Sequence, residues 1–119
     1  MKKIIHVDNS EFFRKLVKSF LQGEGFEVEG FDNAQDANMA IGTEIVDMVI
    51  MGLTFADIEG EEFLIKVVEI FAGPIIVISS SVDNKKEEEL LELGAKAAIS
   101  KSGPWKEDLK PYLSALKQE

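Results

Sequence analysis

Short apolar runs recur along the chain and are separated by amphipathic stretches. Four of these runs lie at residues 3–8, 46–51, 75–78 and 95–100, and residues 26–31 alternate apolar with acidic positions. Continuous apolar runs are typical of strands buried in a parallel sheet, whereas alternation is typical of a strand near a sheet edge. The pattern therefore predicts five strands, the second of them at or near an edge.

Between the strands, apolar residues return at the three- and four-residue spacing of a buried helix face. Ser10 is a candidate N-cap for the first helix, and Gly23-Glu24-Gly25 ends it. Residues 33–41 predict a weaker, polar helix closed by Gly42. The other four apolar stripes are Phe13, Leu16, Val17, Phe20 and Leu21; Leu64, Val67, Val68 and Phe71; Leu90, Leu91 and Leu93; and Trp105, Leu109, Tyr112, Leu113 and Leu116.

Pro111 stands inside the last helical pattern. A proline there removes the hydrogen bond to the carbonyl of Glu107 and disfavours helical geometry at Lys110. Because an interior proline costs about 3 kcal/mol, we expect a first turn opened by Pro104 and a break near residues 108–110. A second segment would then carry Pro111 in its first turn.

Alternating strands and helices without linkers predict one α/β domain over residues 1–119, with a doubly wound parallel sheet and helices on both faces. The chain has 22 acidic and 13 basic residues and a net charge of −9. This balance argues against nucleic-acid binding because phosphates would be repelled. No apolar run is long enough to span a bilayer. The absence of cysteine excludes a disulfide framework and is compatible with a cytoplasmic location, which we expect.

Polar residues follow several strands at the edge where doubly wound sheets bind ligands. Asp8 and Asn9 follow the first strand, Gly52 the third, Ser79 the fourth and Lys101 the fifth. With these residues in these places, the chain resembles the response-regulator receiver domain (CheY-like) along its whole length. The resemblance implies a flavodoxin-like five-stranded sheet of order 2-1-3-4-5 and a role in bacterial two-component phosphorelay signalling.

In that family an acidic pair holds Mg²⁺, an aspartate after the third strand accepts the phosphoryl group, and a hydroxyl and a lysine bind its oxygens. Asp8 matches the first acidic position, but Asn9 stands at the second and Gly52 at the acceptor. Ser79 and Lys101 match the hydroxyl and the lysine, and Thr54 completes the degenerate pocket. Glycine offers no nucleophile, so no aspartyl-phosphate forms there. One carboxylate instead of three leads us to expect no useful Mg²⁺ affinity and no other cofactor.

The resemblance also places Ala98 at the position of the aromatic switch residue, and Ser102 where a proline commonly follows a cis bond. A non-proline cis bond costs about 2.5–4 kcal/mol, so we expect a trans bond. We expect Asp8 and Lys101 to pair directly or through water, and His6 to be a hydrogen-bonded core residue rather than a metal ligand.

Our interpretation is a receiver module that is not an enzyme, is not phosphorylated and binds a protein partner through the face formed by residues 83–117. The alternative is a working phosphorelay receiver with a displaced acceptor, for which Asp8, Asp57 and Glu59 are candidates. An enzyme or nucleotide-binding protein of this fold is disfavoured, because the acidic, bulky loop at residues 8–13 does not suit phosphate. A weakly bound small anion, the oligomeric state and the partner itself stay open.

Overall fold

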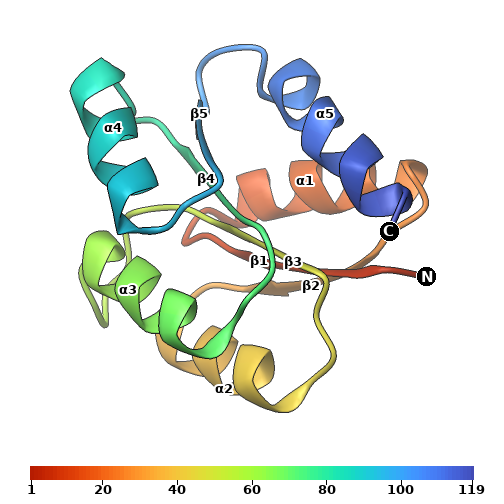
Figure 1. Ribbon diagram of the computed structural model, residues 1–119, viewed down its shortest axis with the longest axis horizontal. Helices are drawn as coiled ribbons and strands as arrows, with labels where there is room; N and C mark the ends of the chain where they lie inside the picture. Colours follow the sequence, from red (N-terminus) through yellow and green to blue (C-terminus); the bar gives the residue numbers. More distant parts are fainter.

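Five strands and five helices alternate along the chain in a computed structural model that describes residues 1–119 (Figure 1). The sheet is parallel, with strand order β2-β1-β3-β4-β5. This confirms the predicted fold, including β2 at an edge. The elements are β1 (Lys3–Val7), α1 (Glu11–Gly23), β2 (Glu27–Phe31), α2 (Ala34–Thr43), β3 (Met48–Met51), α3 (Gly60–Ile70), β4 (Ile75–Ser79), α4 (Asn84–Leu93), β5 (Ala97–Ser100) and α5 (Trp105–Lys117).

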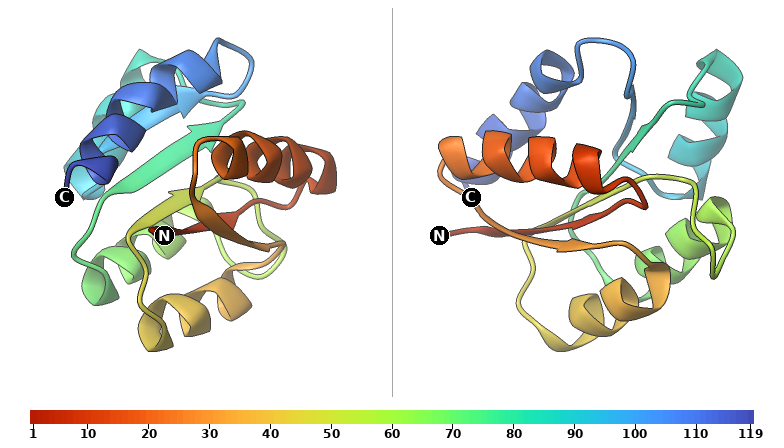
Figure 2. Two further views of the ribbon diagram at one scale, coloured as in Figure 1. Left: turned by 90° about the vertical axis from the view of Figure 1, so that its right-hand side faces the viewer. Right: turned by 180° about the vertical axis from the view of Figure 1, so that it is seen from behind.

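Two apolar layers hold the helices on the sheet. One layer joins the sheet to α1 and α5, and the other joins it to α2, α3 and α4 (Figure 2). Strands β3 and β4 are buried along their whole length, as their continuous apolar sequence predicts. No helix is long and apolar enough to cross a membrane.

Several expected boundaries shift by a few residues. Strand β3 begins at Met48 instead of residue 46, and β5 begins at Ala97 instead of residue 95. Helix α2 passes through Gly42 and ends at Thr43, so the expected stop at the glycine was wrong. The Thr43 hydroxyl donates to the Met39 carbonyl at 2.8 Å, and this bond holds the last turn beyond the glycine.

Helix α5 is uninterrupted from Trp105 to Lys117, so the expected break near residues 108–110 was wrong (Figure 1). Pro104 is the N-cap residue, and Pro111 lies on the exposed side of the helix. Burying a large apolar side chain stabilises a fold by about 1.5–3 kcal/mol, and a proline costs about 3 kcal/mol. The apolar stripe outweighs the penalty because it has buried members on both sides of the proline: Trp105, Leu109, Leu113 and Leu116.

The single histidine is buried in the layer between the sheet and α1. His6 is 1% exposed, and its ring lies 5.8 Å from that of Phe13, edge to face. It is a core residue as expected, but neither ring nitrogen has a hydrogen-bond partner, so that part of the expectation was wrong. Burial lowers the pKa of His6 from 6.5 to about 4, because it disfavours the imidazolium form; nearby Asp8 opposes this and Lys101 reinforces it.

We expect Pro111→Ala to stabilise the domain by about 1–3 kcal/mol, because alanine restores the backbone donor to Glu107 and removes the ring clash. Urea unfolding of both proteins measures the change. Ser114→Ala, on an exposed position of the same helix, is the matched control and should gain less than about 1 kcal/mol. A loss of stability in Pro111→Ala would contradict this account of α5.

We also expect acid to destabilise the domain before its carboxylates titrate. The folded state keeps His6 neutral, whereas the unfolded chain protonates it below pH 6.5. Lowering the pH from about 6.5 to about 5 should therefore remove about 1.5 kcal/mol of the free energy of unfolding. His6→Leu should lose this dependence when both proteins are unfolded by urea across that range. An unchanged slope in His6→Leu would assign the pH dependence to other groups.

Candidate functional site

The register of the sheet brings together the residues at the carboxyl ends of four strands, β1, β3, β4 and β5. Val7 lies opposite Met51 in the β1–β3 pair, so Asp8 and Gly52 are neighbours just beyond it. Ser79 lies opposite Ser100 in the β4–β5 pair, so Lys101 follows beside it. A pocket of about 190 Å³ lies at the carboxyl edge of the sheet. It is lined by Asp8, Gly52, Ser79 and Lys101, together with Asn9, Leu53, Thr54, Ile78 and Ser80.

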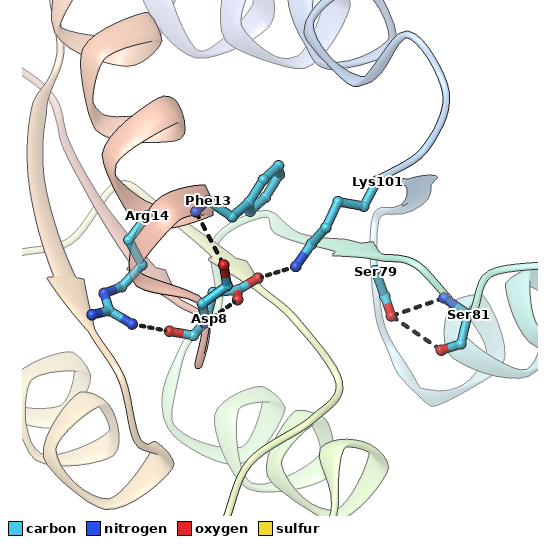
Figure 3. Close-up of polar contacts among 7 residues, drawn as sticks. Asp8, Phe13, Arg14, Ser79, Ser81 and Lys101 are labelled. Atoms are coloured by element: carbon cyan, nitrogen blue, oxygen red, sulfur yellow. Dashed lines mark hydrogen bonds and ion pairs between the residues drawn. The ribbon is translucent and has the colours of Figure 1, made fainter.

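A direct ion pair occupies this pocket. Lys101 Nζ lies 3.0 Å from Asp8 Oδ2, which confirms the expected pairing (Figure 3). Asp8 is 2% exposed, whereas the Lys101 side chain is 26% exposed. The ammonium also lies 4.3 Å from the centre of the Phe13 ring, where a cation is attracted to the aromatic face. Lys101 is therefore held from two sides.

The start of α1 fixes the other side of Asp8. The backbone N–H of Ser10 donates to Asp8 Oδ1 at 2.8 Å, and an Arg14 guanidinium nitrogen donates to the Asp8 carbonyl at 2.6 Å (Figure 3). Ser10 is the N-cap, as predicted, because its hydroxyl accepts from the Phe13 N–H at 3.1 Å. Sequence reasoning missed Phe13 and Arg14 as site residues. Their signal was position, since both belong to the first turn after the Asp8 loop.

Gly52 leaves room that Asp8 uses. A Cβ atom built on Gly52 would lie 3.0 Å from Asp8 Oδ2, closer than nine in ten such contacts. The Gly52 N–H donates to the Val7 carbonyl at 2.9 Å, so the backbone continues the sheet ladder there. Any side chain at position 52 therefore requires the Asp8 carboxylate to give way.

The hydroxyl expected to face the pocket is engaged in a local turn. Ser79 Oγ lies 3.1 Å from Ser81 Oγ and accepts from the Ser81 N–H at 3.3 Å (Figure 3). Asn9 and Thr54 are exposed at the mouth of the pocket. No cis peptide bond occurs, so the bond after Lys101 is trans, as expected.

Of the three candidate displaced acceptors, Asp8 lines this pocket, whereas Asp57 and Glu59 lie outside it. Asp57 accepts hydrogen bonds from the backbone N–H groups of Gln35, at 2.9 Å, and Ala34, at 3.3 Å. These bonds tie the loop after β3 to the start of α2 and hold the pKa of Asp57 below its usual value, with the Gln35 bond the larger cause. Glu59 is exposed and lines a separate hollow with Thr54 and Lys86.

Ala98, the expected switch position, lies in the middle of β5. It is 8% exposed and belongs to the layer shared with α2, α3 and α4. Its methyl group has no polar atom and no ring that could rotate between two positions. Ala98 borders a hollow between α4 and α5 at the β5 edge and does not line the pocket.

Comparison with known proteins gives one consistent family. The model of the response regulator receiver domain matches residues 4–110. The regulatory protein VanRc of Enterococcus gallinarum is 28% identical over 100 residues, which are 84% of this chain and 43% of that protein. A protein-glutamate methylesterase/protein-glutamine glutaminase of Bacillus subtilis is 33% identical over 105 residues, 85% of this chain and 29% of that protein. The chain thus spans less than half the length of these relatives.

Solved structures agree on the fold. A two-component response regulator from Clostridium difficile has a TM-score of 0.90 at 18% identity, covering 100% of this chain and 98% of that one. A CheY-like receiver domain protein from Methanospirillum hungatei has a TM-score of 0.88 at 24% identity, covering 99% and 95%. With the family match across nearly all of its length, the chain belongs to the response regulator receiver domain family.

Proposed function

We propose that this domain is a phosphorylation-independent protein-interaction module of a two-component-type system. The observation that carries the proposal is Gly52 at the end of β3, beside the Asp8–Lys101 ion pair. The position that would present a nucleophilic carboxylate presents only a hydrogen atom. Asp8 lies close to the space that a side chain there would need.

The remaining pocket groups support a static role. Lys101 is paired with Asp8 and packed on Phe13, and the Ser79 hydroxyl is bonded to Ser81. A phosphoryl oxygen in the pocket would have to share Lys101 with Asp8 and Ser79 with Ser81. The same engagement limits the pocket's capacity for a small free anion.

The proposed function does not involve Mg²⁺, because the pocket has too few free carboxylates to hold the ion. Mg²⁺ is usually held by one or two carboxylates together with phosphate oxygens, because dehydrating the ion is costly. Asp8 is the only carboxylate among the pocket residues, and Lys101 already neutralises it. Asn9 adds no charge.

A phosphorelay receiver with a displaced acceptor is the second candidate function. Asp8 and Asp57 fit it poorly, because hydrogen bonds or an ion pair occupy their carboxylates. Glu59 fits it better, since its carboxylate is exposed and makes no hydrogen bond or ion pair. Glu59 also lines a hollow with Thr54 and Lys86 just beyond the pocket.

The proposed module is a cytoplasmic, non-enzymatic domain whose partner is a protein. The partner face comprises residues 83–117, which include α4, β5 and α5. Ala98 on this face has no ring to reorient, so ring rotation at this position cannot change the shape of the face. The larger relatives carry further sequence beyond the matched region, and their activities are not transferred to this chain.

We expect the wild-type domain to gain no phosphoryl adduct when incubated with acetyl phosphate and Mg²⁺, because position 52 carries no carboxylate. Intact-mass spectrometry measures the adduct. Asn9→Asp/Gly52→Asp is the matched positive variant and should acquire Mg²⁺ affinity, measured by calorimetry, because it restores the three-carboxylate set.

An adduct on the wild-type protein would overturn the proposal and favour the second candidate. Glu59→Gln would then identify the acceptor, since loss of the adduct in this variant assigns it to Glu59. Equal Mg²⁺ affinity of the wild type and the double variant would contradict our account of the metal site.

We further expect Lys101→Met to destabilise the domain by about 3 kcal/mol, because it leaves the Asp8 charge buried without a partner. Asp8→Asn/Lys101→Met should recover part of this loss, since it removes both charges. Thermal unfolding of the wild type, Asp8→Asn, Lys101→Met and the double variant gives the coupling energy between the two side chains. Additive effects of the two substitutions would show that the ion pair has no structural role.

A further inference from the structure

Helix α2 presents an uncharged outer face to solvent. Its outward positions are Gln35, Asn38, Met39 and Gly42. The one charged residue of the helix, Asp36, lies in its first turn, where the side-chain amide of Asn33 donates to it at 3.1 Å. The outer face of a surface helix normally carries charged residues, and 29% of this chain is charged. An uncharged outer face on α2 therefore calls for an explanation beyond solubility.

Exposed apolar side chains lie on and beside this helix. Met39 is 65% exposed, Ile45, just after the helix, is 90% exposed, and Ile70 of α3 is 46% exposed. Helices α2 and α3 lie side by side on the face of the sheet away from α1 and α5 (Figure 1). We call the outward positions of α2, together with Ile45 and Ile70, the α2 face.

Gly42 is a glycine that the single domain does not require. It lies inside α2 without a positive φ, and a Cβ atom built on it would meet only Ile70 Cδ1, at 3.9 Å, which is an ordinary contact. A glycine inside a helix is destabilising relative to alanine. Where two helices pack, however, a glycine lets the backbones approach closely. Gly42, one turn after Met39, is thus suited to receive a side chain from a second helix.

Two unpaired charges flank the α2 face on α3. Lys66 lines a hollow with Gln35, in the first turn of α2, whereas Ile70 lies beside Gly42, near the end of α2. Glu69 directly precedes Ile70, and both Lys66 and Glu69 are exposed and lie in no ion pair. A cation therefore lies near the start of α2, and a carboxylate lies near its end.

We propose that the α2 face binds a second copy of this chain in a two-fold symmetric dimer. With the two-fold axis perpendicular to α2, the two α2 helices run antiparallel, and the start of one lies opposite the end of the other. Met39 of each copy then packs over Gly42 of the other copy. Lys66 of each copy meets Glu69 of the other, whereas a parallel pair would bring Lys66 against Lys66.

The charge distribution favours a second copy at this face. Two chains of net charge −9 repel each other, but the outward positions of α2 are uncharged and the flanking charges are opposite in sign. Helix α2 is about 15 Å long, so the contact lies at the low end of the range of about 1,200–2,000 Å² that stable interfaces bury. We therefore expect a weak, concentration-dependent dimer, which leaves α4, β5 and α5 exposed.

Sedimentation velocity of the full chain, from about 1 μM to about 1 mM, measures the dissociation constant of the dimer. We expect the wild type to form dimers towards the upper end of this range. Met39→Glu should weaken the dimer about tenfold or more, because it places a carboxylate in the centre of an apolar contact. Phe12→Glu, the same change at a similarly exposed position on α1, should leave the dissociation constant unchanged.

Gly42→Gln separates the dimer from the stability of the single domain. Glutamine is an uncharged helix former, so this variant should unfold at a higher urea concentration than the wild type. Its side chain holds the two helices apart, so the dimer should weaken about tenfold or more. A glycine kept only for the single domain would give lower stability and no change in self-association.

The two charges on α3 allow a test by mixing. Lys66→Glu and Glu69→Lys should each weaken the dimer about 5- to 30-fold, because each replaces two attractive contacts with two repulsive ones. Glu69→Lys should do so although it lowers the net negative charge of the chain. An equimolar mixture of the two variants should recover the dimer, since every contact between them joins a glutamate to a lysine.

Three results would overturn the inference. They are a wild type that stays monomeric across the whole range, a dimer that Met39→Glu and Phe12→Glu affect equally, and a mixture of the two charge variants that stays monomeric. Thermal unfolding of each variant reports that the fold is kept, as the exposed positions of the substituted residues lead us to expect. Any of these results leaves the proposed function standing, because that proposal rests on Gly52 and the Asp8–Lys101 pair.

Discussion

The ion pair between Asp8 and Lys101 connects two loops at the carboxyl edge of the sheet. It joins the loop after β1 to the loop after β5, which are 93 residues apart in sequence. A buried carboxylate is tolerated only with a partner, because desolvation of an unpaired charge costs several kcal/mol. Asp8 therefore holds Lys101 and the N-terminus of α1 in one arrangement.

Gly52 is what lets this arrangement close. With a carboxylate at position 52, Lys101 would lie between two negative groups, and Asp8 would meet a Cβ atom 3.0 Å away. Glycine brings neither the charge nor the atom, and Asp8 and Lys101 pair directly at 3.0 Å. The loss of a nucleophile and the gain of a fixed contact are thus one structural change.

The alternation of apolar patterns predicted all ten elements, and the polar residues after each strand predicted which groups would meet. Sequence reasoning failed where tertiary packing overrode a local preference. Pro111 sits in an unbroken helix because buried residues on both sides outweigh its cost, and α2 passes Gly42 because Thr43 bonds back to Met39. The ring of Phe13 beneath Lys101 could not be predicted, since a side-chain direction follows from packing and not from spacing.

If the domain acts without phosphorylation, as we propose, it must control a partner by other means. A ligand shifts a conformational equilibrium only through different affinities for two states, and Ala98 has no ring whose rotation could distinguish them. Occupancy of the proposed partner face, residues 83–117, would then follow the concentrations of the two proteins, by mass action. In such a domain the amounts of the two proteins carry the signal.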